Sequence, residues 1–102
     1  MPFKYEAGQV LVQRYCGEPG FYRVERRTAC FMTLTPLEGQ SNLLEKQPLS
    51  MKFEVVPTDT PKSDTKAQRW KIVVDDNGDE TNLCGFALWD GKPVTWYLSN
   101  DD

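Results

Sequence analysis

This chain of 102 residues has a formal net charge of −3 and contains no histidine. Apolar residues make up 39% of it and aromatic residues 12%, a composition that predicts a single folded domain over 1–102 and excludes wholesale disorder. No apolar run approaches the roughly 20 residues that cross a bilayer. Residues 1–6 also lack the apolar stretch of a secretion signal. We therefore expect a cytoplasmic protein without a membrane partner.

Three alternating segments near the start of the chain predict an antiparallel meander. The first covers 9–15, and the second covers 21–27. The third covers 30–35, where Cys30 and every second residue after it should point inward. We expect this third strand to end at Pro36, because proline donates no ladder hydrogen bond.

The remaining predicted strands are 51–55, 70–74, 84–89 and 94–98. Trp70, Ile72 and Val74 should share an inward face, and Trp96 should also be part of the core. Asn77-Gly78 is a strong signal for a hairpin turn. The segment 57–68 has no large apolar residue, so we expect a mobile surface loop there. One or two turns of helix could form only near 42–46.

Strands this short, with turn residues between them and no convincing amphipathic helix, predict an all-β fold. The expected architecture is a small antiparallel SH3-like barrel or a compact sandwich of about six to seven short strands.

Two resemblances extend this prediction. Gly8 followed by β-rich runs at 10–12, 21–24 and 32–37 resembles the opening of SH3-like and KOW-like barrels. The Phe-Tyr-x-Val strand, the Thr-rich strand after it and the Trp-Asp-Gly-Lys-Pro turn at 89–93 resemble short uncharacterised proteins of phages and mobile elements. This second resemblance implies a viral or mobile-element accessory protein in the host cytoplasm. Its sharpest form is an anti-defence inhibitor that binds a host protein.

Catalysis has a poor set of side chains here. Without histidine the commonest general base is missing, so we expect no enzyme, although fifteen acids leave a glycosidase-like carboxylate pair open. Cys16, Cys30 and Cys84 show no Cys-x-x-Cys spacing, and we expect buried thiols, no disulfide and no zinc. In the acidic segment 75–80, Glu80 stands where a calcium loop needs glycine. We expect no metal and no cofactor.

The acidic half of the chain contains the first candidate binding site. Residues 1–52 carry a balance of +2 and residues 53–102 a balance of −5. Acidic side chains gather at two predicted turns, where they could face a basic protein surface. The candidate protein-binding residues are Asp75, Asp76, Asp79, Glu80, Trp89 and Asp90. Trp89 fits equally well a role in packing on its own hairpin.

The alternative site is a nucleic-acid-binding strand formed by Phe21, Arg23, Arg26 and Arg27. Strict alternation places Arg23 and Arg27 on the face of Phe21, and Arg26 either faces the other way or lies in the turn. Arginines beside an aromatic ring are typical of single-strand binders. The acidic balance of the chain favours a host or viral protein as partner over nucleic acid. A structural or self-associating virion protein is the third hypothesis, and the sequence leaves the oligomeric state open.

Overall fold

The computed structural model describes residues 4–14, 18–81 and 85–99, and every pairing among them is antiparallel. The strands are β1 (Val10–Gln13), β2 (Gly20–Arg27), β3 (Phe31–Gln47), β4 (Ser50–Pro61), β5 (Gln68–Lys71), β6 (Val73–Val74), β7 (Glu80–Thr81), β8 (Phe86–Leu88) and β9 (Val94–Ser99). The prediction of an all-β antiparallel fold is confirmed. Within the described ranges, no helix is long and apolar enough to cross a membrane.

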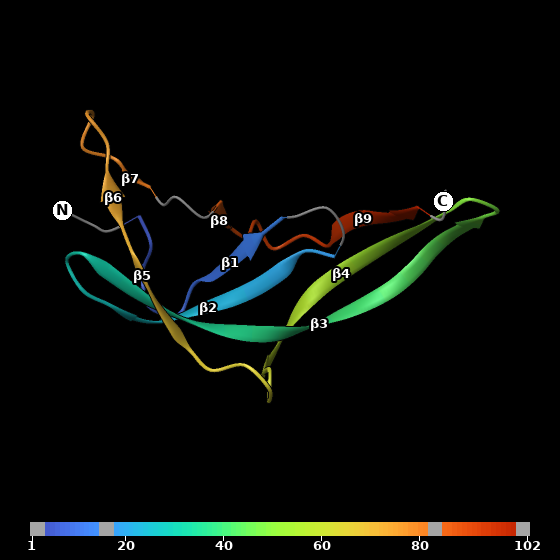
Figure 1. Ribbon diagram of the computed structural model, residues 1–102, viewed down its shortest axis with the longest axis horizontal. Coiled ribbons are helices and arrows are strands. Elements are labelled where there is room, and N and C mark those ends of the chain that lie inside the picture. Colours follow the sequence, from blue (N-terminus) through green and yellow to red (C-terminus); the bar gives the residue numbers. More distant parts are fainter. Residues whose placement is uncertain (1–3, 15–17, 82–84, 100–102) are drawn as a thin grey trace.

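One curled sheet contains most of these strands, in the order β8-β1-β2-β3-β4-β9, and forms a half-barrel (Figure 1). β3 is the central strand. On one side it pairs with β2, and on the other it pairs first with β5 and then with β4. β6 and β7 form a separate two-stranded sheet. Register shifts in β2–β3 and β3–β4 add local twist, which helps the sheet to curl.

β3 and β4 are much longer than the sequence predicted, with 17 and 12 residues. β3 does not end at Pro36. The carbonyl oxygen of Pro36 accepts a hydrogen bond from the Lys62 amide. The nitrogen of Pro36 points to the same side as this carbonyl, towards the junction between β5 and β4, where a missing N–H is tolerated. Residues 42–46 are strand rather than helix, and 57–61 are strand rather than loop. Only 62–67 connect β4 to β5, and their mobility stays a prediction.

The two faces of the sheet each bury an apolar cluster. The first cluster contains Tyr5, Leu11, Val24, Met32, Leu34, Ile72 and Phe86. The second contains Val12, Phe21, Leu37, Val55 and Val94, with Trp89 and Trp96 packed against it. Successive side chains of a strand point to opposite faces, so β1 and β2 contribute to both clusters. The sheet is therefore stabilised from both sides.

Several predictions about inward residues are corrected by the structure. Cys30 is exposed, because it lies in the β2–β3 turn before β3 begins. The predicted strand 70–74 is broken at Ile72, and Val74 is 59% exposed. Trp70 and Trp96 are half-buried beside the clusters rather than within them. Cys16 and Cys84 lie outside the described residues.

Gly39 provides space for the second cluster. A Cβ at this position would lie 2.8 Å from the Cγ2 of Val55, a side chain that is fully buried. We expect Gly39→Ala to lower the free energy of unfolding by about 1–3 kcal/mol, because the core must move to accept the methyl group. Urea denaturation measures the change, and Gln40→Ala at the next, exposed position should have little effect.

Val55→Ala removes the methyl group that the new Cβ would contact. The cost of Gly39→Ala in the Val55→Ala background should therefore be smaller than in the wild type, and a double-mutant cycle measures this coupling. Strictly additive costs would contradict the packing described for this face.

Candidate functional site

A register shift in β2 separates the arginines that strict alternation placed together. Val24 pairs with Leu34, but the next paired residue is Arg26, so Glu25 is an extra residue. After this bulge Arg26 pairs with Thr33, and Arg27 pairs with the buried Met32. The predicted faces are therefore wrong: Arg26 shares the face of Arg23, and Arg27 turns to the opposite face.

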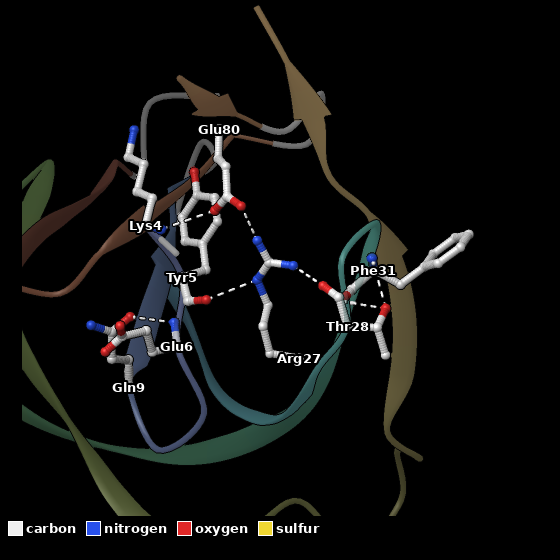
Figure 2. Close-up of polar contacts among 8 residues, drawn as sticks. All are labelled: Lys4, Tyr5, Glu6, Gln9, Arg27, Thr28, Phe31 and Glu80. Carbon is white, nitrogen blue, oxygen red and sulfur yellow. Dashed lines mark hydrogen bonds and ion pairs between the residues drawn. The ribbon is translucent and has the colours of Figure 1, made fainter. Parts of the chain in front are cut away.

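Arg27 is held in a buried polar clamp (Figure 2). Its guanidinium donates to the carbonyl oxygen of Tyr5 at 2.9 Å, to the carbonyl oxygen of Thr28 and to the carboxylate of Glu80. The side chain of Arg27 is 4% exposed and that of Glu80 is 15% exposed. The other Glu80 oxygen accepts the amide hydrogen of Lys4 at 2.9 Å. The clamp thus joins the start of the chain, the end of β2 and β7.

Burial raises the pKa of Glu80, but hydrogen bonds from Arg27 and from the amides of Lys4 and Tyr5 outweigh it. The net pKa lies below the ordinary value of a glutamate. Glu80 is therefore ionised at neutral pH and neutralises a buried guanidinium. Glu80, one of the candidate protein-binding residues, therefore has a structural role in the fold.

The structure does not bring the four candidate residues of the arginine strand together on one exposed face. Arg23 donates two hydrogen bonds to Glu25, at 2.5 and 2.8 Å. This interaction is the main reason that the pKa of Glu25 lies below its ordinary value. Phe21 is 2% exposed and packs edge-on against Trp89, so its ring face is not available to a base. The side chain of Arg27 is buried in the clamp. Arg26 is exposed.

At the acidic hairpin tip, Asp75 organises the turn. Its carboxylate accepts the amide hydrogens of Asn77 and Asp79, both at 2.9 Å, and Gly78 adopts a φ of 82°. The predicted hairpin at Asn77-Gly78 is present. Asp75 and Glu80 have structural roles, and Asp76 and Asp79 are exposed acids of this cluster for which the structure shows no such role.

The second candidate turn is also organised internally. The indole nitrogen of Trp89 donates to the carbonyl oxygen of Lys92 at 2.7 Å, and the Asp90 carboxylate accepts the Lys92 amide hydrogen at 2.9 Å. Trp89 is half-buried against the second cluster. Of its two proposed roles, the structure shows packing on its own turn. Figure 1 also separates the β8–β9 connection from the β6–β7 hairpin, so the two acidic turns do not form one surface.

A hollow of about 540 Å³ lies beside the β1–β2 connection. The residues that line it include three acids, Glu18, Glu38 and Asp64, and one base, Lys62. The Ser41 hydroxyl donates to Glu18 at 3.0 Å. The sequence did not indicate this hollow, because its walls come from three separate segments. Within the described part of the chain, no group of three or more Cys, Asp or Glu could hold a metal ion.

The exposed apolar side chains gather elsewhere, on a part of the sheet that we call the arm. The arm comprises residues 40–47 of β3, 50–56 of β4 and 94–99 of β9, together with the turn between β3 and β4. Figure 1 shows it extending beyond β1, β2 and β5. Five of the seven large apolar side chains that are exposed among the described residues belong to it. They are Leu43, Leu44, Leu49, Tyr97 and Leu98.

One face of the arm continues the second cluster outward. Residues opposite each other in an antiparallel pair share a face. Val55 and Val94 are such a pair and are buried, and the next rows outward contain Phe53 beside Trp96 and Met51 beside Leu98. Leu43 of β3 is opposite Phe53 and therefore belongs to the same face. We call Leu43, Met51, Phe53, Trp96 and Leu98 the arm stripe.

The side chains of the arm stripe range from half-buried to exposed. Phe53 and Trp96 are half-buried and stack at 4.6 Å, whereas Leu98 is 40% exposed and Leu43 is 51% exposed. The indole nitrogen of Trp96 is buried without a hydrogen-bond partner in the structure. The alternation in 51–55 and 94–98 carried the signal for this face, but the sequence did not show that its outer rows lack a cover.

Comparison of this chain with protein-family models, with curated proteins and with solved structures finds no match.

The clamp predicts a specific dependence of stability on pH. Because the pKa of Glu80 is lower in the folded state than in the unfolded chain, the clamp stabilises fully above about pH 5, and this contribution is lost as the pH falls through the folded-state pKa. Glu80→Gln should lower the free energy of unfolding at pH 7 by roughly 3 kcal/mol, because it leaves Arg27 buried without its counter-charge. Urea denaturation between pH 3 and pH 7, values that span the ordinary pKa of glutamate near ~4.3, measures this.

The difference between wild type and Glu80→Gln should shrink in acid, where the wild-type carboxyl is also neutral. Asp79→Asn removes the same charge from the exposed neighbouring position and is the matched control. Equal effects of the two variants at pH 7 would show that general charge, rather than the clamp, sets the stability.

Proposed function

We propose that this protein is a non-catalytic binding module and that the arm binds a protein partner. The observation that carries the proposal is the arm stripe, an apolar surface that is continuous with the core and uncovered at its outer rows. Contiguous exposed apolar surface is costly in water and typically marks a place where another macromolecule binds. Leu49, in the turn at the end of the arm, adds a further apolar side chain that is 65% exposed.

The charges of the arm favour a protein over a nucleic acid. The charged residues of the arm strands are Glu45, Lys46, Lys52 and Glu54, two of each sign. Such a surface cannot neutralise a run of phosphates, which supplies most of the affinity of nucleic-acid binders. Tryptophan and phenylalanine, by contrast, are enriched at the centres of protein interfaces.

The resemblance to phage and mobile-element proteins extends the proposal to the partner's origin. It supports an accessory protein that acts in the host cytoplasm on a host or viral protein, as an anti-defence inhibitor or as part of a virion. This part of the proposal depends on the strand motifs and on the turn at 89–93.

The arm can be tested with two matched double variants. Leu43→Ser with Leu49→Ser removes exposed apolar surface from the arm, and Val74→Ser with Leu88→Ser removes it from positions outside the arm. Each protein is immobilised and exposed to a bacterial lysate, and retained proteins are identified by mass spectrometry. We expect a partner that the wild type and the control retain and that the arm variant loses.

The captured protein is then purified, and its dissociation constant is measured against all three baits. The arm variant should bind at least about tenfold more weakly, as expected when interface side chains near the centre are truncated. A partner that binds the arm variant and the wild type equally would contradict the proposed site, and so would the absence of any protein lost selectively.

A further inference from the structure

β9 is an edge strand that lacks the usual protection against pairing. It lies at one end of the sheet order, runs for six residues and pairs with β4 without a register shift. Its sequence, Val-Thr-Trp-Tyr-Leu-Ser, contains no charge and no proline. Natural proteins usually protect an edge with charges, prolines, bulges or short length, because its free N–H and C=O groups can pair with another strand.

The other edges of the main sheet do carry such protection. β8 has three residues. β5 has four, and Arg69 and Lys71 place two positive charges in it. Among the described strands, β9 is therefore the edge that is open to further pairing, and it belongs to the arm.

A second copy of the chain fits this edge by two-fold symmetry. An antiparallel β9–β9 pair centred on Trp96 places Trp96 opposite its own counterpart and Thr95 opposite Tyr97 of the second copy. Opposite residues share a face, so the row of Phe53 and Trp96 continues directly into the same row of the second copy. The two arm stripes become one surface, and both open edges are closed by a single isologous contact.

The charges beside β9 favour this arrangement. On the other face of the arm, Glu54 is opposite Thr95 and Lys52 is opposite Tyr97. With the axis at Trp96, each row that flanks it therefore contains Glu54 of one copy and Lys52 of the other. An axis at Tyr97 would instead place the two Lys52 residues in one row. With the axis at Trp96, Thr95 and Tyr97 lie between Glu54 and Lys52, so these two charges form no direct ion pair. The axis at Trp96 is favoured because it avoids the row of like charges that an axis at Tyr97 creates.

We infer that two copies of this protein associate through antiparallel pairing of β9 with β9 about Trp96, forming one continuous sheet through both arms. The inference goes beyond the proposed function, because the second copy pairs along the free edge of β9, whereas the arm stripe lies on one face of the same sheet. An interface limited to one strand from each copy is smaller than the roughly 1,200 Å² of stable complexes, so we expect a dissociation constant in the micromolar range.

Sedimentation velocity tests the pairing on the full chain, over concentrations from ~1 to ~500 µM that bracket the expected constant. The wild type should change from monomer to dimer. Thr95→Lys should weaken the dimer at least about tenfold, because an edge lysine blocks strand addition. Its own fold should tolerate the change, since the lysine lies opposite Glu54 of β4, and the melting temperature checks this. Ser63→Lys adds the same charge in the 62–67 connection and should leave the dimer unchanged.

A wild type that stays monomeric at the highest concentration would overturn the inference, and so would a dimer that Thr95→Lys leaves intact. Leu43→Ser with Leu49→Ser leaves the β9 edge unaltered. This variant therefore tests the proposed binding site independently of the β9–β9 dimer. If the chain is monomeric but the lysate partner is lost from that arm variant, the dimer is wrong and the binding site remains. If neither occurs, both proposals fail.

Discussion

The extra residue in β2 determines much of this fold. Because Glu25 is bulged out, Arg27 turns to the face of the first cluster, where its guanidinium reaches Tyr5, Thr28 and Glu80. A buried guanidinium is tolerated only when its charge is neutralised and its donors are satisfied. Glu80 of β7 meets this requirement, and its contact with Arg27 joins the small β6–β7 sheet to β2. The start of the chain is held for the same reason, since the Glu80 carboxylate also accepts the Lys4 amide hydrogen.

Local alternation predicted the fold class and most strand positions, because each predicted strand had to bury every second side chain. It failed where the deciding contacts are distant in sequence. The polar run 38–46 has no strand pattern of its own, and it is extended because β4 supplies hydrogen-bond partners along it. The bulge at Glu25 has no sequence marker such as glycine. Strict alternation of side chains along the strand therefore assigned Arg26 and Arg27 to the wrong faces. Cys30 was placed inside by its apolar neighbours, although it lies in a turn.

In the candidate site too, features set by local sequence could be predicted, and features set by distant contacts could not. The acidic residues Asp75, Glu80 and Asp90 were easy to find because they cluster at turns, and turn chemistry accounts for much of what they do. Asp75 and Asp90 accept backbone amide hydrogens, and Glu80 neutralises a buried arginine. The arm stripe was less visible, since its residues have the pattern of ordinary core strands. Whether such a face is covered depends on where β1, β2 and β8 end, and a single strand pattern contains no information about that.

The strand order has a consequence for the emergence of this chain from the ribosome. β2, β3 and β4 are consecutive and can pair as soon as residue 61 is free. β1, however, finds its second neighbour only in β8, and β4 finds its second neighbour only in β9. Until those late strands are synthesised, both flanks of the nascent sheet expose unpaired backbone, and closing such distant pairs is slow. The growing chain is then most prone to aggregation, and a chaperone that shields strand edges would protect it during this interval.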